Sequence, residues 1–222
     1  MQRDIVLDTE TTGLDPDQGH RVVELAAVEL LNHLPSGRHF HCYINPERDM
    51  PEEAFRVHGL SAEFLSEHPV FAEVVDEFLE FIGDGRLVIH NASFDIRFLN
   101  AELTRCARPL FTYDRAIDTL LLAQRRFPGT ANSLDALCKR FSVDNSGRKL
   151  HGALLDCELL AEVYLHLMGG RQADLGLVLP AVQLAAAATR TPRPARPHAA
   201  SPEELAAHAA FIAGIENPIW AA

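Results

Sequence analysis

The N-terminal segment of the chain reads DIVLDTETTGL over residues 4–14, so that an apolar run ends in two acids, Asp8 and Glu10. The apolar run predicts a buried strand, and side chains two positions apart on a strand point to the same face. Two carboxylates held this close repel each other, so something positive must offset the cost unless the strand end is fully solvated. The segment therefore predicts either a solvated strand end or a cation-binding site.

The rest of the sequence predicts an α/β fold around this first strand, which is expected at 4–7. Two more strands are expected at 21–30 and 39–44, and turn-rich stretches at 15–19 and 35–37 separate the three, which suits an antiparallel meander. A fourth strand is expected at 86–89, and the expected helices cover 70–82, a segment that starts at Asn91 or Ser93, and about 118–126, 133–141 and 153–168. Strands first and helices later indicate a mixed sheet flanked by helices.

Composition and charge limit the possible functions. With 222 residues, of which 47% are hydrophobic, the chain can bury one substantial core. The formal charge of −11 argues against a protein that grips nucleic acid by bulk electrostatics. The four cysteines show no CxxC pairing and are expected to be core thiols of a cytosolic protein. The sequence predicts neither a signal peptide nor a membrane segment.

The composition changes after Gly170. Alanine, arginine and proline become frequent, so residues 178–200 are expected to form a flexible linker without a core. A capping box that starts at Ser201 predicts an amphipathic helix within 201–222. A helix on a tether is expected to dock on a partner, and the alternative is that it folds back onto its own domain.

Further residues with metal or proton chemistry lie downstream of the first strand. Asp95 is expected in the first turn of a helix, and HGALLD carries both His151 and Asp156. A five-residue offset corresponds to about 140° of helix rotation, so His151 is expected in a mobile approach to the helix, where Gly152 permits unusual backbone angles. Each of these carboxylates, judged alone, is more often solvated than catalytic.

Together, the four carboxylates and the histidine fit one reaction, which is the hydrolysis of a phosphodiester with two divalent cations. Mg²⁺ is usually held by a few carboxylates plus a substrate phosphate, and two ions about 4 Å apart activate water and stabilise the leaving oxygen. The positive partner of Asp8 and Glu10 is then metal, and a neutral His151 takes the proton of the attacking water. His39 and His41, with no third ligand nearby, are interpreted as an ordinary surface pair.

The segments DTETTGL, HNASFD and HGALLD, in this order and at this separation, resemble the three motifs of the DEDD exonuclease superfamily in its histidine-bearing branch, DEDDh. The stretch at 132–170, NSLDALCKRFSVDNSGRKLHGALLDCELLAEVYLHLMGG, more specifically resembles the proofreading-subunit family of bacterial DNA polymerase III, and VHGL at 57–60 fits the same family. The resemblance covers 3–170 and implies a catalytic domain at 1–170 with a ribonuclease H-like, five-stranded mixed sheet. It also implies a 3′ to 5′ exonuclease that removes misincorporated nucleotides from a DNA primer end, with two bound Mg²⁺ or Mn²⁺ ions.

The family's catalytic roles carry over to this sequence by position. Asp8 would bridge both ions, Glu10 and Asp156 would complete the site of the ion that activates water, and Asp95 would support the second ion. His151 would be the general base. The substrate-binding residues that the resemblance implies are Thr11, Thr12, Gly13, Leu14, His58, Asn91 and Phe94. For His58 and Phe94, packing in the core or against a helix is an equal alternative.

The tail also resembles this family. Residues 171–177 fit the short motif by which polymerase partners enter the sliding clamp, through Gln172, Leu175 and Leu177. The segment 201–222 resembles the anchor to the alpha (polymerase) subunit of DNA polymerase III, and its candidate contacts are Leu205, Phe211, Ile212 and Trp220. Tethering beside a primer end supplies effective concentration, which suits an acidic nuclease. The expected substrate is a single-stranded or mispaired DNA 3′ end, at a replisome in the bacterial cytoplasm.

Two other functions stay open at this point. An exoribonuclease of the same superfamily that trims RNA has the same catalytic residues, but it has no need of clamp and polymerase segments. A non-catalytic scaffold that joins clamp and polymerase gives no reason to keep mutually repelling acids. A comparison of ribose and deoxyribose substrates separates the two enzymes, and the presence of any activity rejects the scaffold.

Overall fold

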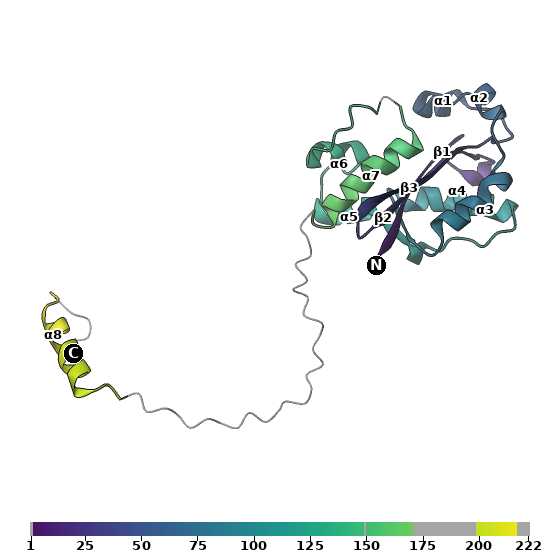
Figure 1. The fold of residues 1–222 in the computed structure, drawn as a ribbon. Helices are drawn as coiled ribbons and strands as arrows, with labels where there is room; N and C mark the ends of the chain where they lie inside the picture. The colour runs from purple at the N-terminus through teal and green to yellow at the C-terminus, as the bar shows by residue number, and fades with distance from the viewer. Residues whose placement is uncertain (1, 149, 171–198, 217–222) are drawn as a thin grey trace, which may run out of the picture. The chain divides into compact units, whose positions relative to one another are not determined.

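The computed structural model describes residues 2–148, 150–170 and 199–216 (Figure 1). The chain divides into two compact units, Met1–Ala173 and Asp174–Ala222, which are described one at a time. The first unit is built on a five-stranded mixed sheet in the order β3-β2-β1-β4-β5, with helices packed on both faces. This arrangement confirms the predicted α/β class.

The central strand, β1 (Arg3–Thr11), carries the first acids of the predicted site. It pairs antiparallel with β2 and parallel with β4, and the other strands of the sheet are β2 (Val22–Leu31), β3 (Leu34–Tyr43), β4 (Arg86–Ile89) and β5 (Ala116–Asp118). Ile5 belongs to one apolar cluster and Val6 to the other, because successive side chains of β1 point to opposite faces. The strand runs through Asp8 and Glu10, whereas the sequence placed its end before them.

The hairpin between β2 and β3 turns earlier than predicted. The two residues of its loop, Asn32 and His33, have φ of 51° and 68°, the left-handed conformation that a tight two-residue hairpin turn requires. The predicted turn at 35–37 therefore lies inside β3, next to a register irregularity between Val28 and Leu30. Pro35 and Gly37 suggested a turn, but β3 is an edge strand of the sheet, and an edge strand tolerates both residues.

The helices predicted at 70–82, 118–126, 133–141 and 153–168 are confirmed to within one residue at each end, and the helix predicted from Asn91 or Ser93 is confirmed at its start. They are α3 (Phe71–Ile82), α4 (Ala92–Arg105), α5 (Thr119–Arg126), α6 (Leu134–Phe141) and α7 (Ala153–Leu167). The predicted first residues of α5 and α6, Asp118 and Ser133, are N-caps whose side chains accept hydrogen bonds from the first turn.

The sequence analysis missed the shortest elements. These are α1 (Glu52–His58), α2 (Ala62–Ser66), strand β5 and two single turns of 3₁₀ helix, η1 (Pro16–Gln18) and η2 (Tyr113–Arg115). Each is too short for apolar periodicity to emerge, and α1 follows Pro51 without a side-chain cap.

The two faces of the sheet are covered by different helices (Figure 1). On one face, α3 and α4 contribute large buried side chains such as Phe78 and Phe98. On the other, α5, α6 and α7 contribute Ala123, Leu137 and Leu160 respectively, and α7 packs across β1 and β2. All four cysteines are free, but only Cys138 and Cys157 are fully buried, so the prediction of core thiols holds for these two alone.

The described part of the second unit contains α8 (Pro202–Ala213). Its predicted capping box is present: Ser201 Oγ accepts from the backbone N–H of Glu204 at 3.2 Å, and Glu204 Oε2 accepts from that of Ser201 at 2.8 Å. Leu205 and Phe211 are exposed. The predicted linker up to residue 198 and the predicted contacts Gln172, Leu175, Leu177 and Trp220 lie outside the described residues. None of the described helices is long and apolar enough to cross a bilayer.

Candidate active site

The five predicted catalytic side chains line one pocket of about 500 Å³ at the end of the sheet. Asp8 and Glu10 reach it from the same face of β1, Asp95 from the first turn of α4, and Asp156 from the first turn of α7. His151 precedes α7 and lines the same pocket. The residues that the sequence placed far apart in the chain are therefore brought together by the fold.

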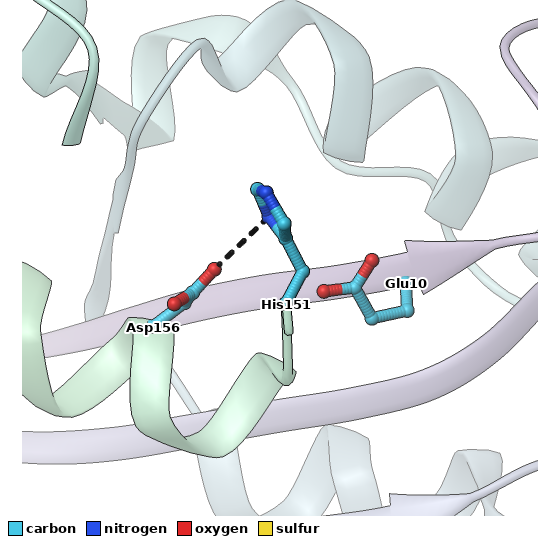
Figure 2. A group of neighbouring side chains, drawn as sticks. All are labelled: Glu10, His151 and Asp156. Carbon is cyan, nitrogen blue, oxygen red and sulfur yellow. Dashed lines mark ion pairs between the residues drawn. The ribbon is translucent and has the colours of Figure 1, made fainter. Parts of the chain in front are cut away.

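Three of these residues form a compact group of potential metal ligands. Glu10, His151 and Asp156 each offer one ligand atom within 4.8 Å of the others. Figure 2 shows their side chains converging from β1, from the segment before α7 and from α7, with His151 Nδ1 3.5 Å from Asp156 Oδ2. Carboxylate oxygens beside an imidazole suit a divalent cation, so this donor set fits the metal that the sequence predicted.

His151 approaches Asp156 because the chain changes conformation between them. Gly152 is extended, with φ of −153° and ψ of 123°, and the helix begins at the next residue. The backbone N–H of His151 also donates to Val57 O at 3.1 Å, which ties it to α1. Gly152 does not use the unusual backbone angles that a glycine permits, since an extended conformation is open to any residue.

A residue that the sequence analysis missed, Arg148, lies in the middle of the site. Its Nε and Nη2 donate to Asp156 Oδ1 and Oδ2 at 2.6 and 2.7 Å, and its Nη1 lies 2.8 Å from Asp135 Oδ1. Nη2 is also 2.9 Å from His151 Nδ1. Its side chain is only 8% exposed. The signal in the sequence was a cation three residues before the proposed base, the first of the two in RKLHGALLD.

Three acids of the site, Asp8, Glu10 and Asp95, have raised pKa values because they are buried beside other carboxylates. Burial is the largest cause for Asp8, whose pKa lies well above its usual range, and the carboxylates of Asp95 and Glu10 add to it. Burial followed by the charge of Asp156 raises the pKa of Glu10 to about 8. The site thus concentrates negative charge that a divalent cation would offset.

Asp95 is positioned by a contact from β1 and by the capped start of its own helix. Burial raises its pKa to about 7, and Thr9 Oγ1 opposes this shift by donating to Asp95 Oδ1 at 2.7 Å. The start of α4 is fixed by Asp118, whose carboxylate accepts from the backbone N–H groups of Asn91 and Ala92 and also caps α5. Asn91 has φ of 68° and makes no side-chain cap of its own, although the sequence offered it as one.

A second pocket of about 540 Å³ adjoins the first and shares Thr9, Glu10 and Phe94 with it. All but one of the predicted substrate-binding residues line it, namely Thr11, Thr12, Gly13, Leu14, His58 and Phe94, and Asn91 lines the carboxylate pocket instead. Leu14 is 82% exposed and free to meet a ligand. Phe94 also packs on Phe98 at 4.9 Å between ring centroids, so the predicted helix packing is present in a residue that lines the pocket.

His58 is buried at the wall of this second pocket. Its Nδ1 accepts from the backbone N–H of Leu60 at 3.0 Å, which leaves the proton on Nε2 if the ring is neutral. Within the described part of the chain, Nε2 has no hydrogen-bond partner. Burial lowers the pKa of His58, so the ring is favoured in its neutral form.

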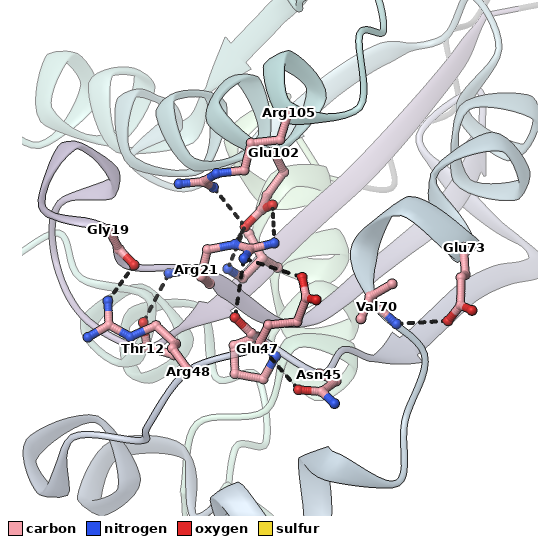
Figure 3. A network of polar contacts seen from close by, with 12 residues as sticks. Thr12, Gly19, Arg21, Asn45, Glu47, Arg48, Val70, Glu73, Glu102 and Arg105 are labelled. Atoms are coloured by element: carbon pink, nitrogen blue, oxygen red, sulfur yellow. Dashed lines mark hydrogen bonds and ion pairs between the residues drawn. The ribbon is translucent and has the colours of Figure 1, made fainter.

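A network of polar contacts supports the backbone around Thr12 through Arg21 and Glu102 (Figure 3). Thr12 Oγ1 accepts from the backbone N–H of Arg21 at 3.0 Å, and the Arg21 guanidinium donates to both oxygens of the buried Glu102, at 2.7 and 3.0 Å. Gly13 lies against His20, where a Cβ would come within 2.3 Å of the ring. The wall of the pocket is therefore rigidly supported.

His41 is not the ordinary surface residue that the sequence suggested. Its Nε2 lies 2.7 Å from Oε1 of the buried Glu24, which is directly opposite Glu10 across the β1–β2 pair. His39, by contrast, is exposed. The prediction of a surface pair was thus wrong for His41, because the acid on the neighbouring strand was not considered.

Known proteins share both the sequence and the fold of this chain. The RNase_T family model, described as exonuclease, matches residues 5–164. DNA polymerase III subunit epsilon of Rickettsia felis is 53% identical over 221 residues, which cover 96% of each chain. A solved structure of exonuclease X in complex with 5′ overhanging duplex DNA is 27% identical, with a TM-score of 0.60 over 76% of this chain and 91% of that one. The nuclease domain of 3′hExo, a DEDDh family member bound to rAMP, is 18% identical and has a TM-score of 0.66 over 75% and 92% of the two chains, and this similarity confirms the ribonuclease H-like fold.

Proposed function

Because this chain belongs to the epsilon family of DNA polymerase III, the proofreading 3′–5′ exonucleases, we propose that its reaction takes place among Asp8, Glu10 and Asp156. Asp95 and His151 complete the site. The observation that carries the assignment is the convergence of Glu10, His151 and Asp156 within 4.8 Å, beside two further acids in the same pocket.

Enzymes of this type use divalent metals, and we assign two Mg²⁺ or Mn²⁺ ions to the acids of the pocket. Asp8 lines the pocket together with Glu10, Asp95 and Asp156, and it would hold both ions, with Glu10 and Asp156 as further ligands of one ion and Asp95 of the other. Bound there, the ions would supply positive charge to the scissile phosphate and make the attacking water more acidic. The raised pKa values of Glu10 and Asp95 support this assignment, because acids that resist ionisation alone ionise readily beside a cation.

His151 is the proposed general base. Its ring stands beside Asp156 at the mouth of the pocket, and it is about half exposed, so a water molecule can reach it. A neutral imidazole there takes the proton of the attacking water and returns it to solvent. The backbone contact with Val57 holds the residue in place during this exchange.

The adjoining pocket is proposed to receive the 3′-terminal nucleotide. Leu14 and Phe94 offer apolar surface to a base, and the His58 Nε2–H is a buried donor that a nucleotide oxygen could satisfy. A single strand or a frayed, mispaired end reaches this pocket more easily than a paired end, since the terminal base must leave its stack.

The test is digestion of a 3′-mismatched DNA primer, with matched single-stranded DNA and RNA as comparison substrates. The expected results are removal of the mispaired DNA nucleotide, loss of activity with EDTA and loss of activity in Asp8→Asn. Preference for RNA would favour the exoribonuclease alternative, and unimpaired digestion by Asp8→Asn would contradict the proposed site.

We also assign partner contacts to the tail. Membership in the epsilon family places the chain in a polymerase complex, and we propose that 201–222 binds the alpha subunit, that 171–177 binds the sliding clamp, and that the complex acts in the cytoplasm. Exposed Leu205 and Phe211 on α8 support the first assignment, because large apolar side chains on a helix surface favour docking. The double variant Leu205→Ala, Phe211→Ala should lose binding to the alpha subunit, whereas His208→Ala on the same helix should keep it.

A further inference from the structure

Arg148 makes the densest set of polar contacts in the active site, and the proposed reaction gives it no role. Its guanidinium engages both oxygens of Asp156, at 2.6 and 2.7 Å, and both side chains are almost fully buried. A planar guanidinium and a carboxylate that meet in this way form one of the strongest polar pairs in proteins. A guanidinium stays charged at any physiological pH, so Arg148 is a permanent cation at this position.

The same two oxygens of Asp156 are the ones assigned to a divalent cation. A cation that approaches Asp156 meets a guanidinium that spans both oxygens, and each oxygen has already given one lone pair to a short hydrogen bond. Two positive groups that share one carboxylate also repel each other. Arg148 and the metal are therefore competitors for Asp156.

Arg148 also determines which nitrogen of His151 carries a proton. A guanidinium has only donors, so the 2.9 Å contact from Nη2 makes His151 Nδ1 an acceptor and leaves the proton of the neutral ring on Nε2. In this arrangement the lone pair of Nδ1 is engaged and Nε2 already holds a proton. Neither nitrogen can take a proton from water until Arg148 moves.

Arg148 has a second acidic partner, Asp135, towards which its guanidinium can move. Its Nη1 lies 2.8 Å from Asp135 Oδ1, and the Asp135 side chain is 58% exposed at the edge of the pocket. Rotation of the guanidinium about this contact releases Asp156 and His151 together while the charge of Arg148 keeps a partner. The exchange therefore leaves no buried cation unpaired.

We propose that Arg148 is a positioning residue that latches Asp156 and His151, and that a divalent cation opens this latch by displacing the guanidinium towards Asp135. The base is thereby released only when the metal site is filled, which couples water activation to metal loading. This inference rests on the proposed function, since it takes Asp156 as a metal ligand and His151 as the base.

The first test measures Mn²⁺ affinity of chelator-treated full-length protein by calorimetry. Arg148→Gln should bind Mn²⁺ about tenfold more tightly than the unaltered protein, the size of effect expected from one charge-assisted pair. Arg148→Lys keeps the positive charge but cannot donate to both oxygens of Asp156 at once, so its gain in Mn²⁺ affinity should be smaller. The matched control is Arg108→Gln, which removes the same forked geometry, Nε and Nη2 on Asp76 at 2.7 and 2.8 Å, from a surface site. Its Mn²⁺ affinity should not change.

The second test reads His151 directly by ¹⁵N NMR of the unaltered protein. Without a cation, Nδ1 should show the signal of an acceptor and Nε2 that of a protonated nitrogen. Saturation with Mg²⁺ should abolish this preference, and Arg148→Gln should lack it from the start. This measurement uses the native chain, so it holds even where a variant folds poorly.

Several outcomes would overturn the latch. Equal or weaker Mn²⁺ binding by Arg148→Gln would show that Arg148 does not compete. If Arg148→Gln binds Mn²⁺ more tightly but Arg148→Lys binds it as the unaltered protein does, the positive charge alone opposes the metal and the two-point contact of the guanidinium has no part in it. An unchanged His151 signal in Mg²⁺ would show that the base is never released. If Asp8→Asn binds Mn²⁺ as tightly as the unaltered protein, the proposed metal site fails as well, whereas the first three results leave it intact.

Discussion

Thr9 Oγ1 donates a 2.7 Å hydrogen bond to Asp95 Oδ1, and this contact joins the central strand to α4 across the active site. Thr9 stands between the two acids of β1, so the same short segment supplies two carboxylates and orients a third. The contact lowers the cost of ionising Asp95, whose pKa is otherwise raised by burial.

Thr9→Val removes this donor with little change in volume. A buried carboxylate that loses a hydrogen bond costs about 1–3 kcal/mol, so the free energy of unfolding should fall by this amount at pH 8. The Mg²⁺ concentration for half-maximal digestion should also rise. Urea denaturation and a Mg²⁺ titration measure these effects. Thr104→Val, which removes a surface hydroxyl bonded to Asn100 O, is the control that should change neither.

The stability of chelated protein should depend on pH through Glu10 and Asp95. Their pKa values rise on folding from 4.5 and 3.8 to about 8 and about 7, so the folded state keeps protons that the unfolded state releases. Their contribution is fully present below about pH 4 and is lost as the pH rises through 7 and 8.

The free energy of unfolding in EDTA should therefore fall between pH 5 and pH 8, and Mg²⁺ should restore it. Glu10→Gln should flatten this decline, while Glu67→Gln, a change at an exposed acid, should not. A Glu10→Gln profile that runs parallel to that of the unaltered protein would contradict the raised pKa.

Gly13→Ala should damage the nucleotide pocket. A Cβ would lie 2.3 Å from His20 Cε1, so the ring must move or the pocket wall must shift. The KM for a single-stranded 3′ end should rise by about tenfold if one contact is lost. Gly214→Ala, whose Cβ would meet only Phe211 O at 3.5 Å, is the matched control. Replacing His20 by Ala as well should recover part of the loss, and no recovery would argue against this clash.

Asp118→Ala should destabilise two helices at once. The carboxylate accepts from backbone N–H groups at the starts of α4 and α5, and the loss of one cap costs about 1 kcal/mol. A decrease of about 2 kcal/mol in the free energy of unfolding is expected. Asp118→Asn retains an acceptor oxygen and should lose much less, and equal losses in the two variants would exclude capping as the cause.

Much of the fold could be predicted because its signals are local. The periodicity over 70–82 and the caps Asp118 and Ser133 marked helices to within a residue. The turn at Asn32 and His33 was missed because its positive φ values come from hairpin twist, while Pro35 and Gly37 gave a stronger local signal in the wrong place. Elements as short as α1 and β5 are stabilised by tertiary packing, which no local pattern records.

In the candidate site too, some residues could be predicted from local sequence signals and others could not. Its acids and His151 could be predicted from their motifs, and the fold places all of them in one pocket. Arg148, Asp135 and Thr9 could not, because their importance comes from distances between side chains that are remote or unremarkable in sequence. The pairing of His41 with Glu24 was missed for the same reason, since it depends on strand register.

The most direct measurement of the central claim is anomalous diffraction from crystals of the chain soaked in Mn²⁺ with a nucleoside monophosphate. The account predicts Mn²⁺ peaks in contact with Asp8, Glu10 and Asp156, with the guanidinium of Arg148 displaced from Asp156. An active protein whose Mn²⁺ binds elsewhere, with these carboxylates free of metal, would contradict it.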